Sequence, residues 1–165
     1  MSLTATPRTW VAAEVVTAAE MNAEIRDAVL GLEAGWTAYT PAWTAVTTNP
    51  VLNNGTITGA YMLVGKTLHF RIKLVMGSGT TYGSGEYRFS LPPGLTAAET
   101  TFYAPMGTGF CRDDSASTKY PRLAGISTST TVNLADMSGA LVTNAAPFTF
   151  ATSDIIIVSG CCEVA

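Results

Sequence analysis

The feature that most constrains this chain is a nine-residue run, residues 68–76, in which apolar side chains occupy every second position. The apolar positions are Leu68, Phe70, Ile72, Leu74 and Met76. The positions between them hold His69, Arg71, Lys73 and Val75. Because successive side chains of a β-strand point to opposite faces, this period of two predicts a strand with one face in the core.

A second run, Thr56 to Val64, precedes that strand, and Gly65-Lys66 separates the two. Glycine supplies the positive φ that a tight turn needs, so the pair predicts a β-hairpin. Further strands are predicted over residues 36–46, 86–91, 101–111, 123–127, 131–134, 148–151 and 154–164. Turn residues separate them and no helical pattern intervenes, which favours an antiparallel β-sandwich or jelly roll. The Gly/Ser stretch 77–85 is predicted to be a long, mobile hairpin loop.

The pattern changes near Gly35, which divides the chain into an N-terminal segment, residues 1–35, and a β-sandwich domain, residues 36–165. Residues 1–11 show no periodicity and predict an extended attachment arm. The residues expected to carry that attachment are Pro7, Arg8, Trp10 and Val11. Thr17 and Glu20 have the spacing of a capping box, which marks the start of a helix. The predicted fold is therefore mainly β, with one short N-terminal α-helix before the sandwich.

The predicted helix carries a heptad-like apolar seam with spacings of three and four. The seam consists of Ala18, Met21, Ile25, Ala28 and Leu32. A helix of about two heptads is marginal alone in water, so it must pack on its own β domain, on sister copies, or on another protein. Apolar residues make up 47% of the chain and charged residues only 13%. We therefore favour self-association, with these five residues at the interface of a homotrimer.

Composition argues against several classes of partner. A net charge of -3 offers no positive field for a phosphate backbone, so nucleic acid is not an expected partner. We find no apolar run of about 20 residues and no signal-peptide pattern, which predicts synthesis in the cytoplasm and no membrane partner. The three cysteines predict no disulfide framework. Cys161 and Cys162 are adjacent on a predicted strand and should point to opposite faces, with one or both buried.

The chain lacks the residue patterns of the common catalytic and cofactor sites. His69 is the only histidine, which argues against a His-rich metal site or a Ser-His-Asp triad, and we predict neither a metal nor a cofactor. Six carboxylates are candidates for a glycosidase pair: Glu86, Glu99, Asp113, Asp114, Asp136 and Asp154. Most lie beside turn residues, where Asp is favoured for local hydrogen bonding. We predict that the protein is not an enzyme.

The N-terminal residues resemble a known family. The stretch 7–27, PRTWVAAEVVTAAEMNAEIRD, is similar to the start of tail-associated proteins from phages and prophages of actinobacteria, with Ala13 where Gly is common. Segments 39–43, 54–56, 65–66, 83–85, 89–92 and 153–154 look like further family landmarks, whereas Cys161-Cys162-Glu163 departs from the pattern, in which an aromatic residue often precedes Glu. The resemblance implies a virion component of the minor tail or tail-fibre type, and a trimer.

Three functions are consistent with these observations. The leading one is a tail-associated or surface-projecting virion subunit that contacts other virion proteins of the tail or capsid and binds a host cell-surface glycan through its loops. The residues expected to contact the glycan are Ser78, Thr80, Tyr82, Ser84, Asp113, Asp114 and Lys119. The second is a trimeric capsid decoration protein that stabilises the shell. The third is a hydrolase acting on cell-wall glycans.

Overall fold

The computed structural model describes residues 9, 11–26, 29, 35–100 and 106–165. Its helical part comprises α1 (Ala18–Met21) and the π-helical turn η1 (Asn22–Arg26). The described residues form nine strands: β1 (Thr37–Tyr39), β2 (Trp43–Ala45), β3 (Thr56–Val64), β4 (Thr67–Val75), β5 (Tyr87–Ser90), β6 (Gly107–Asp113), β7 (Thr118–Thr128), β8 (Thr131–Ala135) and β9 (Ile155–Glu163). The mainly β fold with one short N-terminal helix is confirmed.

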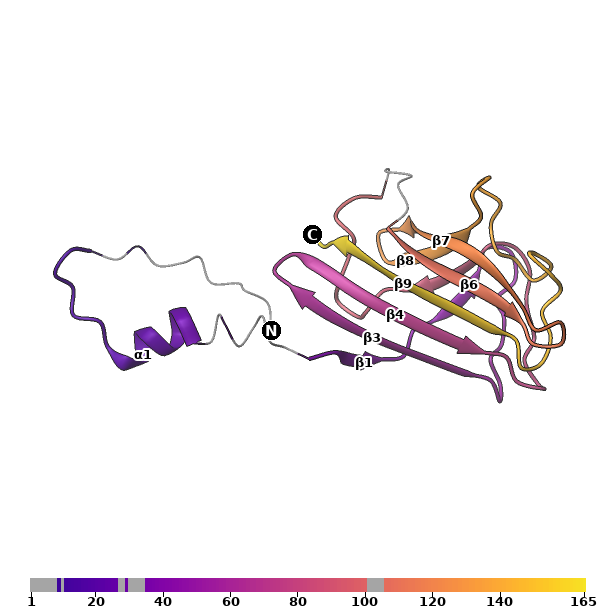
Figure 1. Ribbon diagram of the computed structural model, residues 1–165, viewed down its shortest axis with the longest axis horizontal. Helices are drawn as coiled ribbons and strands as arrows, with labels where there is room; N and C mark the ends of the chain where they lie inside the picture. The colour runs from indigo at the N-terminus through magenta and orange to yellow at the C-terminus, as the bar shows by residue number, and fades with distance from the viewer. Residues whose placement is uncertain (1–8, 10, 27–28, 30–34, 101–105) are drawn as a thin grey trace.

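All nine strands belong to one antiparallel sheet, ordered β1-β3-β4-β9-β6-β7-β8-β5-β2. The strands at its two edges, β1 and β2, are separated in the sequence by residues 40–42 alone. Because an extended chain advances at most about 3.6 Å per residue, the ends of these edge strands lie within about 14 Å of each other. The sheet must therefore curl until its edges almost meet, and Figure 1 shows β3, β4, β9 and β6 forming one layer of the result.

Hydrogen bonds around Ser90 join the two edges. The Ser90 N–H donates to the Ala42 carbonyl at 2.9 Å, and the Ala42 N–H donates to Ser90 Oγ at 2.9 Å. The Tyr39 hydroxyl, at the end of β1, donates to the Ser90 carbonyl at 3.3 Å. These bonds hold the chain between β1 and β2 against β5, so the edges are tied together.

The core fills the space inside the curled sheet. The alternation predicted for residues 68–76 is confirmed, since the five apolar side chains are buried while Arg71 and Lys73 are exposed. The β3–β4 hairpin is also confirmed, with Gly65 in the left-handed region at φ 59°. From the other layer, β5 and β8 contribute the buried side chains Tyr87, Phe89, Val132 and Leu134. Tyr87 packs edge-on against Trp43, with ring centroids 5.1 Å apart.

Two strand predictions are wrong. Residues 36–46 form two strands, because Pro41 lies in the break between them and has no N–H to donate to a ladder. Residues 148–151 form no strand. Phe148 and Phe150 instead lie in an irregular segment with their ring centroids 4.6 Å apart, so their aromatic character reflects packing and not strand pairing.

The segment 77–85 is not the free, mobile hairpin loop that its composition predicts. It lies antiparallel to residues 48–51, with bridges from Val51 to Thr81 and from Thr48 to Ser84. Thr80 is only 7% exposed, and its hydroxyl donates to the Leu52 carbonyl at 2.7 Å and accepts from the Gly77 N–H at 2.9 Å. Buried hydrogen bonds therefore hold the segment against the preceding loop.

The N-terminal helix begins where the sequence predicts. The Glu20 N–H donates to Thr17 Oγ1 at 3.2 Å, and the Thr17 N–H donates to the Glu20 carboxylate at 2.8 Å, which confirms the capping box. None of the residues of α1 is buried, and Met21 and Ile25 are 46% and 49% exposed. Pro7, Arg8, Trp10, Ala28 and Leu32 lie outside the described residues, so the arm and the complete seam stay predictions.

The cysteines follow the predicted strand geometry. Cys161 is exposed and Cys162 is 5% exposed, so the adjacent side chains do point to opposite faces of β9. Cys111 is fully buried. Burial raises the pKa of the Cys111 thiol to about 12, so this side chain stays a neutral thiol in the core.

Glycines permit a close approach between β6 and β9. A Cβ at Gly109 would lie 2.2 Å from the Ile157 carbonyl oxygen, and one at Gly107 would lie 2.1 Å from the Ser159 carbonyl oxygen. Glycine inside a strand often marks a tight bend or a close backbone approach. The close pairing of β6 with β9 therefore requires glycine at positions 107 and 109.

We expect Gly109→Ala to destabilise the protein by about 2 kcal/mol or more, because backbone must move to admit the new methyl group. Chemical denaturation measures the change. Gly125→Ala on β7 is the matched control, since its Cβ would meet only Asn133 Oδ1, at 3.4 Å. Equal stabilities of the two variants would contradict a tight β6–β9 approach.

Candidate functional site

A groove of about 620 Å³ lies on the outer face of β5, β7 and β8. Its side chains alternate with buried core residues: Glu86 and Arg88 flank Tyr87, and Asn133 lies between Val132 and Leu134. One wall comes from the loop after β8, which folds back through a bridge between Ala135 and Leu141. We refer to this feature as the Glu86 groove.

The Glu86 carboxylate organises the base of this groove. Its Oε1 accepts hydrogen bonds from Ser127 Oγ at 2.8 Å and from Asn133 Nδ2 at 2.7 Å. Its Oε2 pairs with Arg88 Nη2 at 3.0 Å, and the Glu86 side chain is 15% exposed. Burial raises the pKa of Glu86, but these hydrogen bonds and the Arg88 charge outweigh that effect, and the pKa lies below its ordinary value. Glu86 is therefore an ionised hydrogen-bond acceptor at neutral pH.

Asp136 is the second carboxylate of the groove, and it builds the wall. One of its oxygens accepts from the Ser138 N–H, the Ser138 hydroxyl and the Ala140 N–H, at 2.8, 2.7 and 3.0 Å. These bonds lower the pKa of Asp136. A glycosidase requires one carboxylic acid with a raised pKa to protonate the leaving group. Both carboxylates of the groove have the opposite shift.

The groove combines hydrogen-bonding groups with apolar rims. Arg88 carries donors, whereas Ser127 Oγ, whose one hydrogen is donated to Glu86, and the Asn133 carbonyl are acceptors. Met137 and Leu141 are 89% and 37% exposed at the edge. Its volume is typical of small-ligand sites. Two carboxylates beside one guanidinium disfavour an anionic ligand, whereas hydroxyl groups can donate to one side and accept from the other. The lining therefore suits a neutral, hydroxyl-rich ligand.

The structure brings the two predicted recognition loops to one end of the sheet. Val75 at the end of β4 and Arg112 near the end of β6 both pair with Ile155 at the start of β9. Between them, the Asp154 carboxylate, 1% exposed, accepts from the Asp114 N–H at 2.8 Å and from the Ala151 N–H at 2.7 Å. The loops 77–85 and 112–119 are thus neighbours.

Several residues predicted to contact a ligand there have structural roles instead. Thr80 is buried, which corrects its assignment to a recognition surface, because its hydroxyl completes the backbone hydrogen bonding of the loop. Tyr82 is half-buried, and its carbonyl accepts from the Tyr87 hydroxyl at 2.7 Å. Asp113 accepts from Ser115 Oγ at 2.7 Å, and Asp114 pairs with Arg112 at 2.8 Å.

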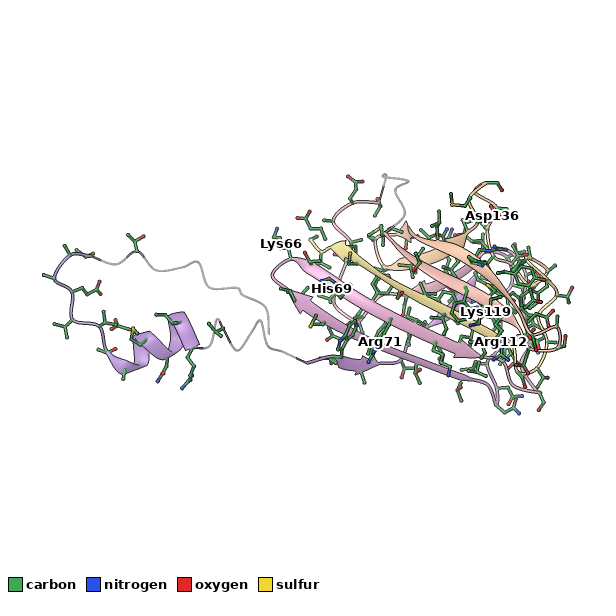
Figure 2. All side chains as sticks on the ribbon, in the orientation of Figure 1. Lys66, His69, Arg71, Arg112, Lys119 and Asp136 are labelled. Atoms are coloured by element: carbon green, nitrogen blue, oxygen red, sulfur yellow. The ribbon has the colours of Figure 1, made fainter. Side chains whose placement is uncertain are left out.

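The remaining predicted contact residues differ in exposure. Ser78 and Lys119 are exposed, whereas Ser84 is half-buried. Figure 2 shows Lys119 and Arg112 near the end of the sheet where these loops lie. Lys119 Nζ lies 5.4 Å from the centre of the Phe110 ring, which places its charge over an apolar neighbour.

Sequence reasoning named Glu86 as a carboxylate candidate but missed Arg88, Ser127 and Asn133. The alternation along β5 places Glu86 and Arg88 on one face, and that signal was available in the sequence. Asn133 reaches Glu86 only because β8 pairs with β5, and Ser127 only because β7 pairs with β8. No local pattern encodes these pairings.

Among the residues that the structure describes, no group of three or more His, Cys, Asp or Glu side chains is placed to hold a metal ion. None of the helices described here is long and apolar enough to cross a membrane.

We expect Glu86→Gln to lower the free energy of unfolding at pH 7 by about 1 to 3 kcal/mol, since the Arg88 ion pair is lost. A carboxyl with a lowered folded-state pKa stabilises the protein above its unfolded pKa, near 4.5, and loses that contribution as the pH falls through the folded value. The difference in free energy of unfolding between wild type and variant should therefore shrink in acid. Chemical denaturation at several pH values from about 3 to about 7 measures it. A difference independent of pH would contradict the network. Glu163→Gln, at an exposed position, is the control for stability.

The chain was compared with family models, curated proteins and solved structures. No family model matches the sequence, and no curated protein matches it. The resemblance of residues 7–27 to phage tail-associated proteins therefore stays a prediction. Among solved structures, the chain is similar to the crystal structure of the Dettilon tailspike protein (gp208), with a TM-score of 0.46 and 14% sequence identity. The match covers 79% of this chain and 24% of the tailspike chain, so this chain spans about a quarter of that protein's length.

Proposed function

We propose that this chain is a structural subunit of a bacteriophage particle, a homotrimer associated with the tail. In this proposal residues 1–35 attach the subunit and the β domain projects from the surface. The observation that carries it is the N-terminal helix: a capping box fixes its start, yet Met21 and Ile25 remain about half exposed. Exposed apolar side chains on a short helix favour a partner, since burial contributes about 25 cal/mol per Å². The resemblance of residues 7–27 indicates what kind of particle is assembled.

We further propose that the β domain binds a host-surface glycan in the Glu86 groove. The mixed donors and acceptors of Arg88, Ser127 and Asn133 suit sugar hydroxyls, and exposed Met137 offers an apolar contact for a ring face. A single groove of this kind binds a glycan weakly. The proposed trimer presents three such grooves, which raises its avidity for the host surface. The exposed Ser78 and Lys119 extend the candidate surface at the end of the sheet.

The same proposal assigns no catalytic role to the protein. Glu86 and Asp136 both have lowered pKa values, and Asp113 is committed to its own turn. Asp154 is buried and hydrogen-bonded to two backbone N–H groups. These environments favour binding over general acid catalysis.

We expect the purified protein to sediment with host cell walls and to release no reducing sugar from them. Gly125→Leu should reduce the bound fraction about tenfold, because the new side chain occupies the groove beside Asn133. Gly125→Ala is the matched control, since its single methyl group fits. Unchanged binding by the Leu variant would remove the groove from the proposal, and sugar release would overturn the non-enzymatic role.

The second candidate is a capsid decoration trimer. Before the β domain the described residues show α1, η1 and the helical Val29, and the whole N-terminal segment is 35 residues long. A compact domain on a short attachment segment also suits a shell surface. This candidate differs from the leading one in location alone.

Immunogold electron microscopy of intact particles separates the two candidates. We expect antibodies against the β domain to label the tail. Label confined to the head would replace the tail role with the decoration role. Particles that carry no copy of the chain, checked by mass spectrometry of purified virions, would contradict both roles.

A further inference from the structure

The net negative charge of this chain is confined to its N-terminal segment. Residues 1–35 contain five carboxylate side chains and two arginines. Residues 36–165 contain seven Lys and Arg and seven Asp and Glu, so the β domain is neutral as a whole. An acidic segment is thus joined to a domain whose charges balance but are unevenly distributed.

Two of the seven Lys and Arg residues of the β domain, Arg71 and Lys73, lie on the outer face of β3, β4 and β9. On β4 the outward side chains are His69, Arg71 and Lys73. Their cross-strand neighbours on β3 are Met62, Ala60 and Thr58, and those on β9 are Cys161, Ser159 and Ile157. None of these nine described residues is acidic. We call them the basic face, and Figure 2 shows His69 and Arg71 along β4.

The basic face also has a place for apolar side chains. A shallow groove of about 430 Å³ runs over it, lined by Thr58, Ala60, Ile157 and the stems of Arg71 and Lys73. Both cations are exposed, and among the described residues neither forms an ion pair. Cations that flank an apolar floor match an amphipathic helix with carboxylates beside its apolar seam.

The chain enters the β domain beside this face. Trp36, immediately before β1, is 44% exposed, and its ring lies 4.6 Å from the Arg71 guanidinium carbon. Nine residues, 27–35, separate Arg26 from Trp36.

We infer that the acidic N-terminal helix of one copy packs on the basic face of a second copy. Met21 and Ile25 lie over the shallow groove, and the acidic character of residues 1–35 matches Arg71 and Lys73. The second copy is the occupant because, in the part of the chain that the structure describes, Met21 and Ile25 are about half exposed, while Arg71 and Lys73 are exposed and form no ion pair. The π-helical turn η1 also interrupts the heptad spacing that a helix bundle would require. The inference rests on the self-association in the proposed function.

Light scattering of full-length chains tests this pairing through charge reversal. The face variant carries Arg71→Glu and Lys73→Glu, and the helix variant carries Glu24→Lys and Asp27→Lys, which leaves the capping box intact. We expect each variant alone to raise the dissociation constant of the oligomer at least about tenfold, because like charges then face each other. Combining all four changes in one chain should restore the trimer. Mixing the two variants should raise the mass above that of either variant alone, because only two of the three contacts in a mixed ring pair opposite charges. Lys66→Glu, in the β3–β4 turn, is the control for charge reversal outside the face.

Each outcome separates the possibilities. Increased mass on mixing supports exchange of helices between copies, and its weakening at about 0.5 M salt supports charge pairing. If wild type associates and both variants associate equally well, the trimer stands and the helix packs elsewhere, which overturns the inference. If the combined variant is restored but mixing leaves the mass of both single variants unchanged, the helix docks on its own chain, which also overturns the inference. A monomeric wild type overturns both the inference and the proposed trimer, and far-ultraviolet circular dichroism checks that every variant is folded.

Discussion

The fold depends on the short connection between its two edge strands. Only residues 40–42 separate β1 from β2, although the other seven strands lie between them in the sheet. A flat sheet of nine strands would be about 38 Å wide at about 4.8 Å per strand spacing, which those residues cannot span. Curling is therefore obligatory, and it creates the enclosed core. The bonds from Tyr39 and Ala42 to Ser90 fix the closure once it has formed.

Curling also gives the domain two outer faces with different chemistry. The face on β3, β4 and β9 carries the exposed Arg71 and Lys73 among small and apolar residues, and no described carboxylate pairs with either cation. The face on β5, β7 and β8 carries a hydrogen-bond network in which Arg88, Ser127 and Asn133 all bond to Glu86. The proposed assembly surface and the proposed ligand groove therefore lie on different strands of the curled sheet.

Local patterns in the sequence predict most elements but few of their partners. The period of two around Ile72, the turn at Gly65 and the capping box at Thr17 each depend on neighbouring residues, and the structure confirms all three. Strand order depends on contacts between distant segments. Glu86 and Asn133, which meet in the groove, are 47 positions apart. The burial of Thr80 was not predicted for the same reason. The Leu52 carbonyl that accepts a hydrogen bond from its hydroxyl lies 28 positions away in the sequence.

In the N-terminal segment, contacts within one turn fix the start of the helix, whereas burial of its apolar side chains requires another surface. Thr17 and Glu20 fix where the helix begins through bonds within one turn. The residues Ala18–Arg26 form α1 and η1, and Val29 is helical as well. Met21 and Ile25 are about half exposed, so their burial against a partner would stabilise the helix. In the proposed assembly, helix formation and subunit association should therefore be thermodynamically coupled.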